Sequence, residues 1–296
     1  MKTKSGSFKK NLLLFAILTF AAVQSFAQSA TKVDSGYAPV NGLKMYYEIY
    51  GSGKPLVLIH GGVGAIEMFT PILPTLSQDH KVIAVDLQAH GRTADIDRPL
   101  SYQSMAEDIA ALLKYLKIDR ADVMGYSLGG GVALRTAIQH PEVVSKIVLV
   151  SAPFKRDGWY PEILAGMAQM GPAVAEPMKQ TPIYQLYTQI APRPQDWAVL
   201  LAKLGDLLKQ DYDWSEDVKK IKSQTLIVVG DADAVRTAHA VEFFELFGGG
   251  QRDAGWDGSG RPANCELAIL PGLTHYTIFN SSALASTAVA FLDSKN

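Results

Sequence analysis

The sequence is poor in cysteine, in clustered charge and in long apolar runs, and each shortage excludes a class of protein. Its 296 residues contain one cysteine, Cys265, so no internal disulfide can form. Lysine and arginine number 28 against 29 aspartate and glutamate, which leaves no basic excess for a nucleic-acid partner. The six histidines lack the spacing of a zinc site, and we expect neither a metal nor another cofactor.

The N-terminus has the composition of a targeting segment. Four lysines precede an apolar run from Leu12 to Val23, and Ser25-Phe26-Ala27 forms a small-x-small cleavage pattern. A transmembrane anchor needs about 20 apolar residues, which is more than this run contains. The sequence therefore predicts a signal peptide over residues 1–27 and a periplasmic or secreted mature protein without a stable membrane anchor.

Short apolar segments alternate with helical patterns along the rest of the chain. Asn41-Gly42 separates the segments 37–40 and 43–50, as in a two-residue hairpin turn. Six further segments rich in Val, Ile and Leu predict strands buried on both faces, at 56–59, 82–85, 122–125, 147–150, 226–229 and 267–270. Helical spacing occurs at 105–116 after Ser104 as the expected N-cap, at 129–139, at 237–247 and at about 281–292. This order predicts an α/β protein with a doubly wound, mostly parallel sheet.

Two stretches interrupt the alternation. Residues 154–214 combine prolines with many aromatic and methionine side chains, and we expect an inserted helical cap there, on a core made of residues 28–153 and 215–296. Residues 248–264 are rich in glycine and polar residues around Trp256, and they predict a long solvated loop.

The segment from Gly125 to Gly129 carries the strongest chemical signal. It reads Gly-Tyr-Ser-Leu-Gly, follows a predicted strand and precedes a predicted helix, which is the context of a nucleophile elbow. Glycine is needed on both sides because the turn leaves no room for a Cβ atom. We therefore predict that Ser127 is a catalytic nucleophile.

A serine nucleophile requires a histidine base and a carboxylate that orients the histidine. His275 follows the strand at 267–270, and Asp231 and Asp233 follow the strand at 226–229, so all three belong to the carboxyl edge of the sheet. We predict His275 as the base and Asp233 as the acid. Asp231 is the alternative acid, and otherwise it caps the next helix or faces solvent.

An oxyanion hole needs two backbone N–H donors. Leu128, directly after the nucleophile, is one expected donor, and Gly62, after an earlier strand, is the other, with Gly61 as the alternative. We interpret His60 as a buried residue that braces this loop. The segment 86–92 also contains an aspartate and a histidine, and we interpret it as a structural loop rather than a second acid–base pair.

Together these motifs make the chain resemble the α/β-hydrolase fold family over residues 37–292. The resemblance rests on His-Gly-Gly at 60–62, the segment 86–92, the elbow, Gly230-x-x-Asp233 and Pro271-x-x-x-His275. It implies a serine hydrolase with the catalytic triad Ser127, Asp233 and His275.

Variants of the motifs separate related enzymes. Haloalkane dehalogenases and epoxide hydrolases resemble this chain but use aspartate where Ser127 stands. Proline iminopeptidases usually have His-Gly-Gly-Pro-Gly and a tryptophan after the serine, whereas this chain has Val63 and Leu128. The Gly-x-Ser-Leu-Gly-Gly form is similar to esterases, enol-lactonases and cofactor-free perhydrolases.

The sequence thus predicts a secreted serine hydrolase of a small-molecule carboxylic ester or lactone. The cap composition favours a large apolar substrate, such as the macrolactone opened by a macrolide esterase. Candidate substrate contacts are Gly61, Tyr126, Trp159, Met167, Met170 and Tyr187. The alternatives are an iminopeptidase, a perhydrolase and a non-catalytic binding protein of the same fold.

Overall fold

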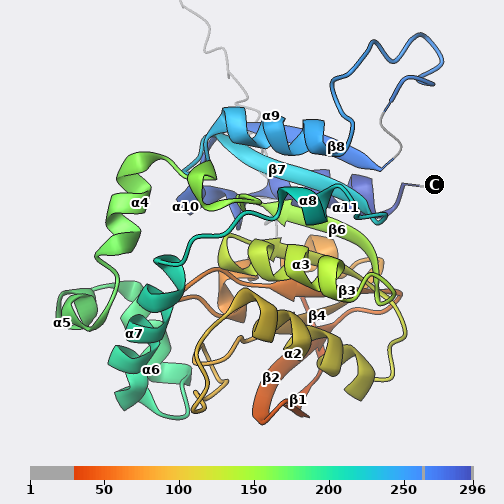
Figure 1. The fold of residues 1–296 in the computed structure, drawn as a ribbon. Coiled ribbons are helices and arrows are strands. Elements are labelled where there is room, and N and C mark those ends of the chain that lie inside the picture. Colours follow the sequence, from red (N-terminus) through yellow and green to blue (C-terminus); the bar gives the residue numbers. More distant parts are fainter. Residues whose placement is uncertain (1–29, 262–263, 295–296) are drawn as a thin grey trace, which may run out of the picture.

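The computed structural model describes residues 30–261 and 264–294, and the predicted signal peptide lies outside them. The described part is built on an eight-stranded sheet with the order β1-β2-β4-β3-β5-β6-β7-β8 (Figure 1). The strands are β1 (Lys32–Val40), β2 (Leu43–Tyr50), β3 (Lys54–Ile59), β4 (His80–Val85), β5 (Ala121–Tyr126), β6 (Val144–Val150), β7 (Gln224–Ala232) and β8 (Cys265–Thr274). The pairs β1–β2 and β2–β4 are antiparallel and the other pairs are parallel, which confirms the predicted mostly parallel sheet.

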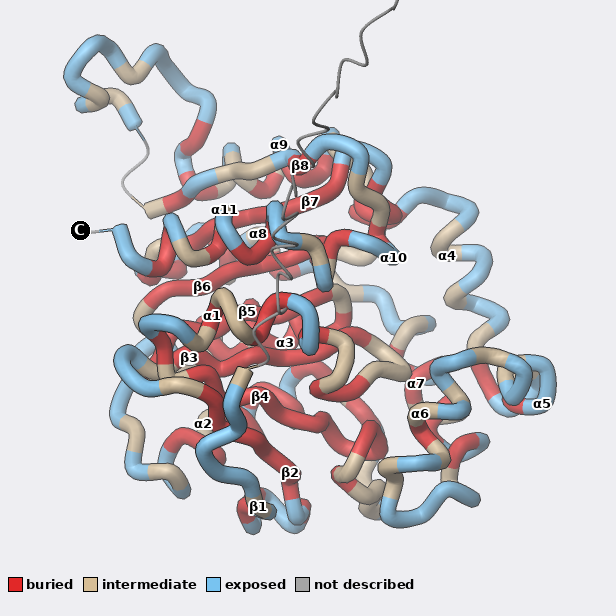
Figure 2. Tube along the Cα trace, turned by 180° about the vertical axis from the view of Figure 1, so that it is seen from behind, coloured by how far each residue is buried: buried red, intermediate tan, exposed pale blue. Residues whose placement is uncertain are grey.

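Helices cover both faces of the sheet. On one face lie α2 (Tyr102–Tyr115), α3 (Leu128–Gln139) and α9 (Thr237–Leu246), and on the other lie α1 (Leu73–Leu76) and α11 (Ser282–Leu292). In β3, Val57 and Ile59 join the core on the first face, whereas Leu56 and Leu58 join the core on the second. Successive strand residues are therefore all apolar, and Figure 2 shows the central strands buried between the helices.

The start of α2 differs from the prediction. The N-cap is Ser101, whose side chain accepts a hydrogen bond from the backbone N–H of Ser104 at 3.0 Å. The predicted N-cap Ser104 is therefore wrong, because it lies inside the first turn. The helix begins earlier because Tyr102 is itself buried against the core, where its ring packs on Gly131.

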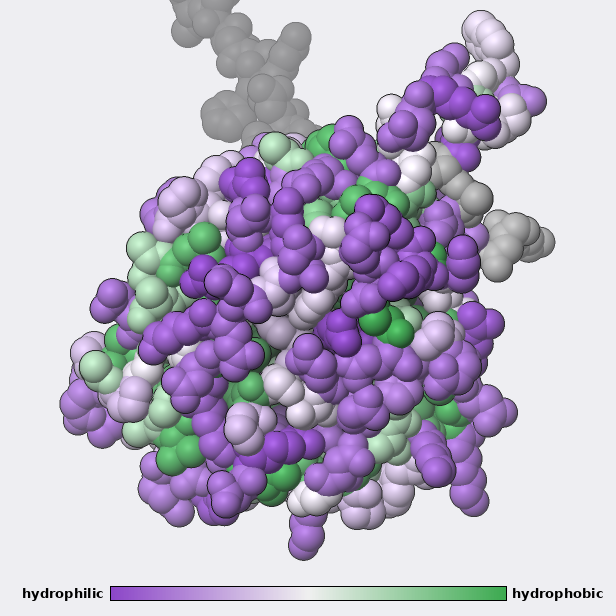
Figure 3. Space-filling model, in the orientation of Figure 1, coloured by the Kyte–Doolittle hydropathy of each residue, from purple (hydrophilic) through white to green (hydrophobic). Residues whose placement is uncertain are grey.

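The segment between β6 and β7 contains helices in place of strands. After a short 3-10 turn come α4 (Pro161–Ala168), α5 (Ala175–Met178), α6 (Pro182–Ile190), α7 (Trp197–Leu208) and α8 (Ser215–Val218). The chain leaves and returns at one place, since the N–H of Trp214 donates to the carbonyl of Phe154 at 3.1 Å. Between these two points α5, α6 and α7 share a small core around Trp197. Figure 3 shows apolar side chains on the side of the molecule where α4 and α6 lie.

The predicted loop between α9 and β8 extends away from the sheet (Figure 1). Its described part is folded on itself by short turns, for example between the N–H of Gly260 and the carbonyl of Ala254 at 2.9 Å. The Trp256 side chain is fully exposed. Within residues 30–261 and 264–294, no helix combines the length and the apolar character needed to cross a bilayer.

Two buried histidines hold the loops that follow β3 and β4. The Nε2 atom of His60 accepts a hydrogen bond from the N–H of Leu87 at 3.1 Å, so its Nδ1 carries the proton and donates to the carbonyl of Gly61 at 2.7 Å. His90 lies beside it, with ring centroids 5.1 Å apart. Burial lowers the pKa of His60 to about 3 and the pKa of His90 to about 4. Both rings are neutral at pH 7, as a bracing role for His60 requires.

Acidification should therefore destabilise the protein. Each histidine takes up a proton near pH 6.5 in the unfolded chain but stays neutral in the fold, so its contribution is present above that pH and is lost as the pH falls. We expect the free energy of unfolding to fall by about 1 kcal/mol per buried histidine between pH 7 and pH 5.5. Urea denaturation across this range measures the slope. His90→Gln should flatten the slope, and an unchanged slope in that variant would contradict the assignment.

Candidate active site

Ser127 lies at the sharp turn between β5 and α3. Its backbone adopts φ 54° and ψ −116°, a conformation that L-residues rarely take. A Cβ atom at Gly125 would collide with the carbonyl of Gly129, and one at Gly129 would collide with the carbonyl of Ile59. The N–H of Ser127 donates to the carbonyl of Val150 at 2.9 Å. The close approach of strand, turn and helix thus holds the serine in a strained position.

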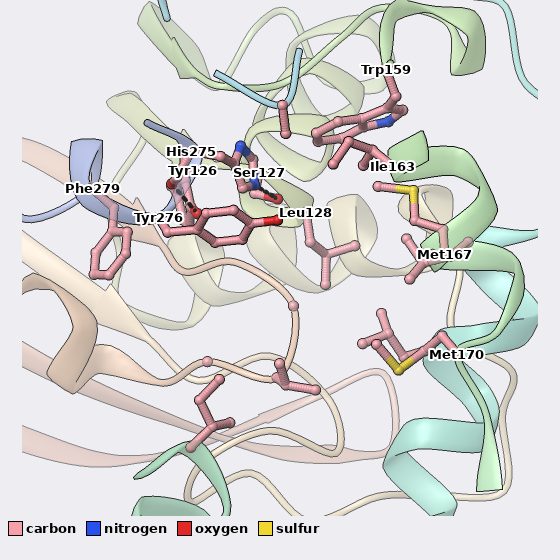
Figure 4. A pocket seen from close by; sticks show the side chains of 18 of the residues that line it. Tyr126, Ser127, Leu128, Trp159, Ile163, Met167, Met170, His275, Tyr276 and Phe279 are labelled. Atoms are coloured by element: carbon pink, nitrogen blue, oxygen red, sulfur yellow. Dashed lines mark hydrogen bonds between the residues drawn. The ribbon is translucent and has the colours of Figure 1, made fainter. Parts of the chain in front are cut away.

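The structure brings Ser127, His275 and Asp233 together, and Figure 4 shows the His275 ring beside Ser127. The Nε2 atom of His275 lies 3.1 Å from the Oγ atom of Ser127, and its Nδ1 atom lies 2.9 Å from Oδ1 of Asp233. His275 is the first residue of α10 (His275–Ile278), directly after β8, and Asp233 directly follows β7. Three segments that are far apart in sequence therefore form one hydrogen-bonded chain from carboxylate to hydroxyl.

The carboxylate of Asp233 is held by several donors. Its Oδ2 atom accepts from the N–H of Gly230 at 3.0 Å and from the Ser151 hydroxyl, and its Oδ1 atom accepts from the N–H of Val235 at 3.1 Å. Burial disfavours the charged form, but the hydrogen bonds from His275 and Ser151 outweigh it and lower the pKa of Asp233 below its usual value. Asp233 is therefore charged at neutral pH and faces His275.

Asp231 points elsewhere. Its side chain is exposed and accepts a hydrogen bond from the N–H of Gly272 at 2.8 Å, which ties the end of β7 to the turn within β8. The alternative in which Asp231 is the acid is wrong. Of its two other expected positions, the structure shows the solvent-exposed one, because the N-cap of α9 is Arg236. The side chains of Asp231 and Asp233 differ because only Asp233 turns inward after the strand ends.

Two hydrogen bonds next to the series Asp233–His275–Ser127 were not expected from the sequence. Ser151, directly after β6, has a φ of 51°, is fully buried and donates its hydroxyl to Asp233. The Tyr126 hydroxyl donates to the backbone carbonyl of His275 at 2.7 Å. The only sequence signal for Ser151 is a polar residue at the carboxyl end of a predicted parallel strand next to the strand that carries the acid.

Two backbone donors stand beside the nucleophile. Gly62 and Leu128 both line the cavity in front of Ser127. Among the hydrogen bonds of the described residues, none uses the N–H of either residue as a donor. The chain passes close to Ser127 at Gly61, where a Cβ atom would come within 3.4 Å of the serine Cβ. Gly62 and Leu128 therefore each have an N–H without a partner among the described residues, in the wall of the cavity that Ser127 also lines.

A cavity of about 550 Å³ opens in front of Ser127 (Figure 4). Its wall is mainly apolar, and it comes from the elbow, from α4, α6 and α7, and from the loops after β3 and β8. The lining includes Met68, Tyr102, Trp159, Ile163, Met167, Met170, Ile183, Leu186, Leu204, Leu208 and Phe279. An apolar cavity with few polar groups near a reactive side chain is the usual form of a small-molecule site.

Four of the predicted substrate contacts belong to this wall and two do not. Tyr126, Trp159, Met167 and Met170 line it, and the edge of Trp159 packs on the His275 ring with centroids 5.4 Å apart. The prediction for Gly61 is wrong: it does not line the cavity, and a Cβ atom there would meet the ring of Tyr126 and the Cβ atom of Ser127.

The prediction that Tyr187 contacts the substrate is also wrong, because Tyr187 does not line the cavity. It is buried in the core shared by α5, α6 and α7, where its ring lies 5.1 Å from that of Trp197. Helical spacing indicates an inward face for this residue, but it does not show whether that face meets the cavity or another helix.

The segment 86–92 has a structural role, as expected. The carboxylate of Asp86 accepts from the N–H of Ile66 at 2.9 Å and from the N–H of Arg92 at 2.8 Å, and it does not line the cavity. Burial raises the pKa of Asp86 to about 7. In the part of the chain that the structure describes, no group of three or more His, Cys, Asp or Glu side chains is placed to hold a metal ion.

Comparison with known proteins places these features in a family. The family model described as alpha/beta hydrolase fold matches residues 54–253. An uncharacterized hydrolase of Bacillus subtilis, YugF, is 31% identical over 130 residues, which cover 43% of this chain and 48% of that protein. The chain spans about a third to a half of the length of the curated relatives it matches.

Solved structures share the fold at low identity. Carboxylesterase CesB of Bacillus subtilis superposes with a TM-score of 0.68 at 18% identity, over 91% of this chain and 93% of that chain. The enol-lactonase of Burkholderia xenovorans gives a TM-score of 0.66 at 21% identity, over 87% of this chain and all of the other (100%).

The contact between Ser151 and Asp233 predicts that Ser151 helps to position the Asp233 carboxylate. Ser151→Ala removes a donor to a charged carboxylate, which we expect to slow the reaction of Ser127 with a fluorophosphonate by about 5- to 10-fold. Without this donor the Asp233 carboxylate keeps more of its negative charge for the His275 ring and favours the protonated ring, so the acid limb of the pH–rate profile should move to higher pH. Labelling rates followed by intact mass between pH 5 and 9 give both values.

The matched control for this test is Ser223→Ala. Ser223 is also buried and donates its hydroxyl to a backbone carbonyl, that of Val144 at 3.1 Å, away from the cavity. It should leave the labelling rate and the profile as they are. Equal profiles for Ser151→Ala and Ser223→Ala would show that Ser151 does not position the acid.

Proposed function

Because the chain belongs to the α/β-hydrolase fold family, we propose that it is a serine hydrolase that cleaves a carboxylic ester or lactone through an acyl-enzyme on Ser127. The observation that carries the proposal is the hydrogen-bonded chain Asp233–His275–Ser127 at the base of an apolar cavity. Carboxylesterase CesB and the enol-lactonase, which share the fold, support the choice of ester or lactone.

The geometry is suited to acyl transfer. The Oγ atom of Ser127 attacks the carbonyl carbon while Nε2 of His275 takes the hydroxyl proton, and the carbonyl electron pair moves onto oxygen. The N–H groups of Gly62 and Leu128 are the proposed donors to this oxyanion, worth several kcal/mol of the barrier. Collapse re-forms the carbonyl and expels the alcohol oxygen, which takes the proton from His275.

Water completes the cycle. His275 removes a proton from a water molecule, whose oxygen attacks the acyl carbon and displaces Ser127. The bond between the acyl carbon and Oγ breaks, and the serine oxygen takes the proton back from His275. Asp233 keeps the His275 ring in one orientation throughout and stabilises its charged form between the two proton transfers.

The size and lining of the cavity favour a bulky apolar substrate. A volume of about 550 Å³ exceeds what a short acyl ester fills, and the methionine and leucine side chains of α4 and α7 can adapt to an irregular shape. We therefore include macrolactones, the substrates of macrolide esterases, in the proposed substrate class.

The first test is hydrolysis of nitrophenyl butyrate and nitrophenyl octanoate by residues 28–296. Ser127→Ala should lose about a thousandfold or more of kcat/KM, because the nucleophile is missing. Ser223→Ala serves as the control with an intact site. Equal rates in the wild type and Ser127→Ala, or no labelling of the wild type by a fluorophosphonate, would favour the non-catalytic binding protein.

The lactone part of the proposal has its own measurement. Opening of a macrolide ring adds one water, so mass spectrometry should show a product 18 Da heavier in a reaction that Ser127→Ala does not support. A panel of macrolides that all remain intact would restrict the function to other esters.

We also propose that residues 1–27 direct export and are removed. The proposal is supported by the four lysines, the apolar run and the small-x-small pattern that ends at Ala27. Expression of the full chain in a Gram-negative host should give a periplasmic or extracellular protein whose N-terminal sequence begins near Gln28. A full-length cytoplasmic product would contradict export.

A further inference from the structure

The cavity wall contains a single carboxylate, Glu162, in the first turn of α4. Among the described residues that line the cavity there is no lysine or arginine, and Glu162 is the one acidic side chain. Glu162 lines the cavity and is also exposed, so it lies where the cavity opens to solvent. We propose that Glu162 binds a cationic group, a protonated or quaternary amine, on an otherwise apolar ester or lactone substrate. This inference rests on the proposed function.

The carboxylate of Glu162 is available for a ligand. Within residues 30–261 and 264–294 it takes part in no ion pair and no hydrogen bond, whereas several other acidic residues of the same segment are paired. Glu176 pairs with Lys179 at 2.6 Å, and Asp196 pairs with Arg193 at 2.7 Å. A cationic ligand would therefore meet an unoccupied partner and would not have to displace a lysine or an arginine.

Helix stability explains why a glutamate occupies the first turn of α4, but it does not explain why that turn lines the cavity. An acidic residue in the first turn of a helix is favoured by the helix dipole, which accounts for a glutamate next to Pro161. The dipole does not require that turn to form part of a cavity wall. The other acids at helix starts, such as Glu216 on α8, do not line the cavity. The combination of an acidic first turn and an apolar cavity is what selects a cationic ligand.

Aromatic rings belong to the same cavity wall as Glu162. Trp159 lies on the wall three residues before Glu162, and Tyr276, which is 69% exposed, lies on the wall next to His275. Figure 4 shows Trp159 on one side of Ser127 and Tyr276 on the other. An alkylammonium group is attracted both to a carboxylate and to the faces of such rings, and its methyl groups tolerate an apolar surface. An anionic group would face Glu162 without a compensating positive charge.

An isosteric pair of esters isolates the charge. Butyrylcholine and 3,3-dimethylbutyl butyrate have the same shape and differ in a quaternary nitrogen against a carbon. We expect the wild-type chain to have the higher kcat/KM with the choline ester, and Glu162→Gln to lower the ratio of the two values about three- to fivefold. Because the ion pair between Glu162 and the quaternary nitrogen would be partly exposed to solvent, salt at about 0.5 M should reduce the preference of the wild type for the choline ester.

Glu245→Gln is the matched control. Glu245 is an exposed carboxylate on α9 that does not line the cavity, so the ratio should stay at the wild-type value. A ratio that is the same in the wild type, Glu162→Gln and Glu245→Gln would overturn the inference while ester hydrolysis by Ser127 still stood.

A binding measurement separates the inference from the proposed reaction. In Ser127→Ala, tryptophan fluorescence reports benzyltrimethylammonium binding next to Trp159, and adding Glu162→Gln should raise Kd about three- to fivefold. Cation binding that depends on Glu162 in a chain that hydrolyses no ester would retain the inference and overturn the proposed function. Equal Kd values in the two variants would overturn the inference.

Discussion

The strained backbone of Ser127 is the constraint on which the site depends. A positive φ at a residue with a side chain costs free energy, and here the close packing of β5, α3 and the loop after β3 outweighs that cost. The same packing leaves space for glycine alone at Gly125 and Gly129. Leu128, directly after the strained serine, lines the same cavity, and its N–H has no partner among the described residues.

The parallel sheet supplies the other partners because it collects chain segments at one edge. β5, β6, β7 and β8 are neighbours and all run in the same direction, so the residues that follow them meet although up to 148 positions separate them. Ser127, Ser151, Asp233 and His275 each follow one of these four strands. The segment between β6 and β7 lies opposite this edge of the sheet, and its helices α4, α6 and α7 contribute much of the apolar wall of the cavity.

Much of this arrangement could be predicted from the sequence. The strands, the elbow and the order serine, aspartate, histidine depend on local patterns: runs of Val, Ile and Leu, glycines that no other residue can replace, and short motifs just past strand ends. Prediction was weaker where two local signals compete. Ser101 and Ser104 are both reasonable N-caps, and only the burial of Tyr102 decides between them. Asp231 and Asp233 are two positions apart in the sequence, and only the structure shows that Asp231 lies at the end of β7 and faces solvent, whereas Asp233 follows the strand and turns inward.

The sequence by itself determined the fold and the places of the candidate nucleophile and its base, because each of these depends on residue types within a few positions of one another. Only the tertiary structure decided which residues surround them. Ser151 joins Asp233, Tyr126 holds the backbone of His275, and Tyr187 is buried in a separate small core, through contacts between distant segments that no local pattern records. Glu162 is an ordinary acidic residue of a helix start in the sequence. It becomes part of the cavity wall because the segment between β6 and β7 folds back over Ser127.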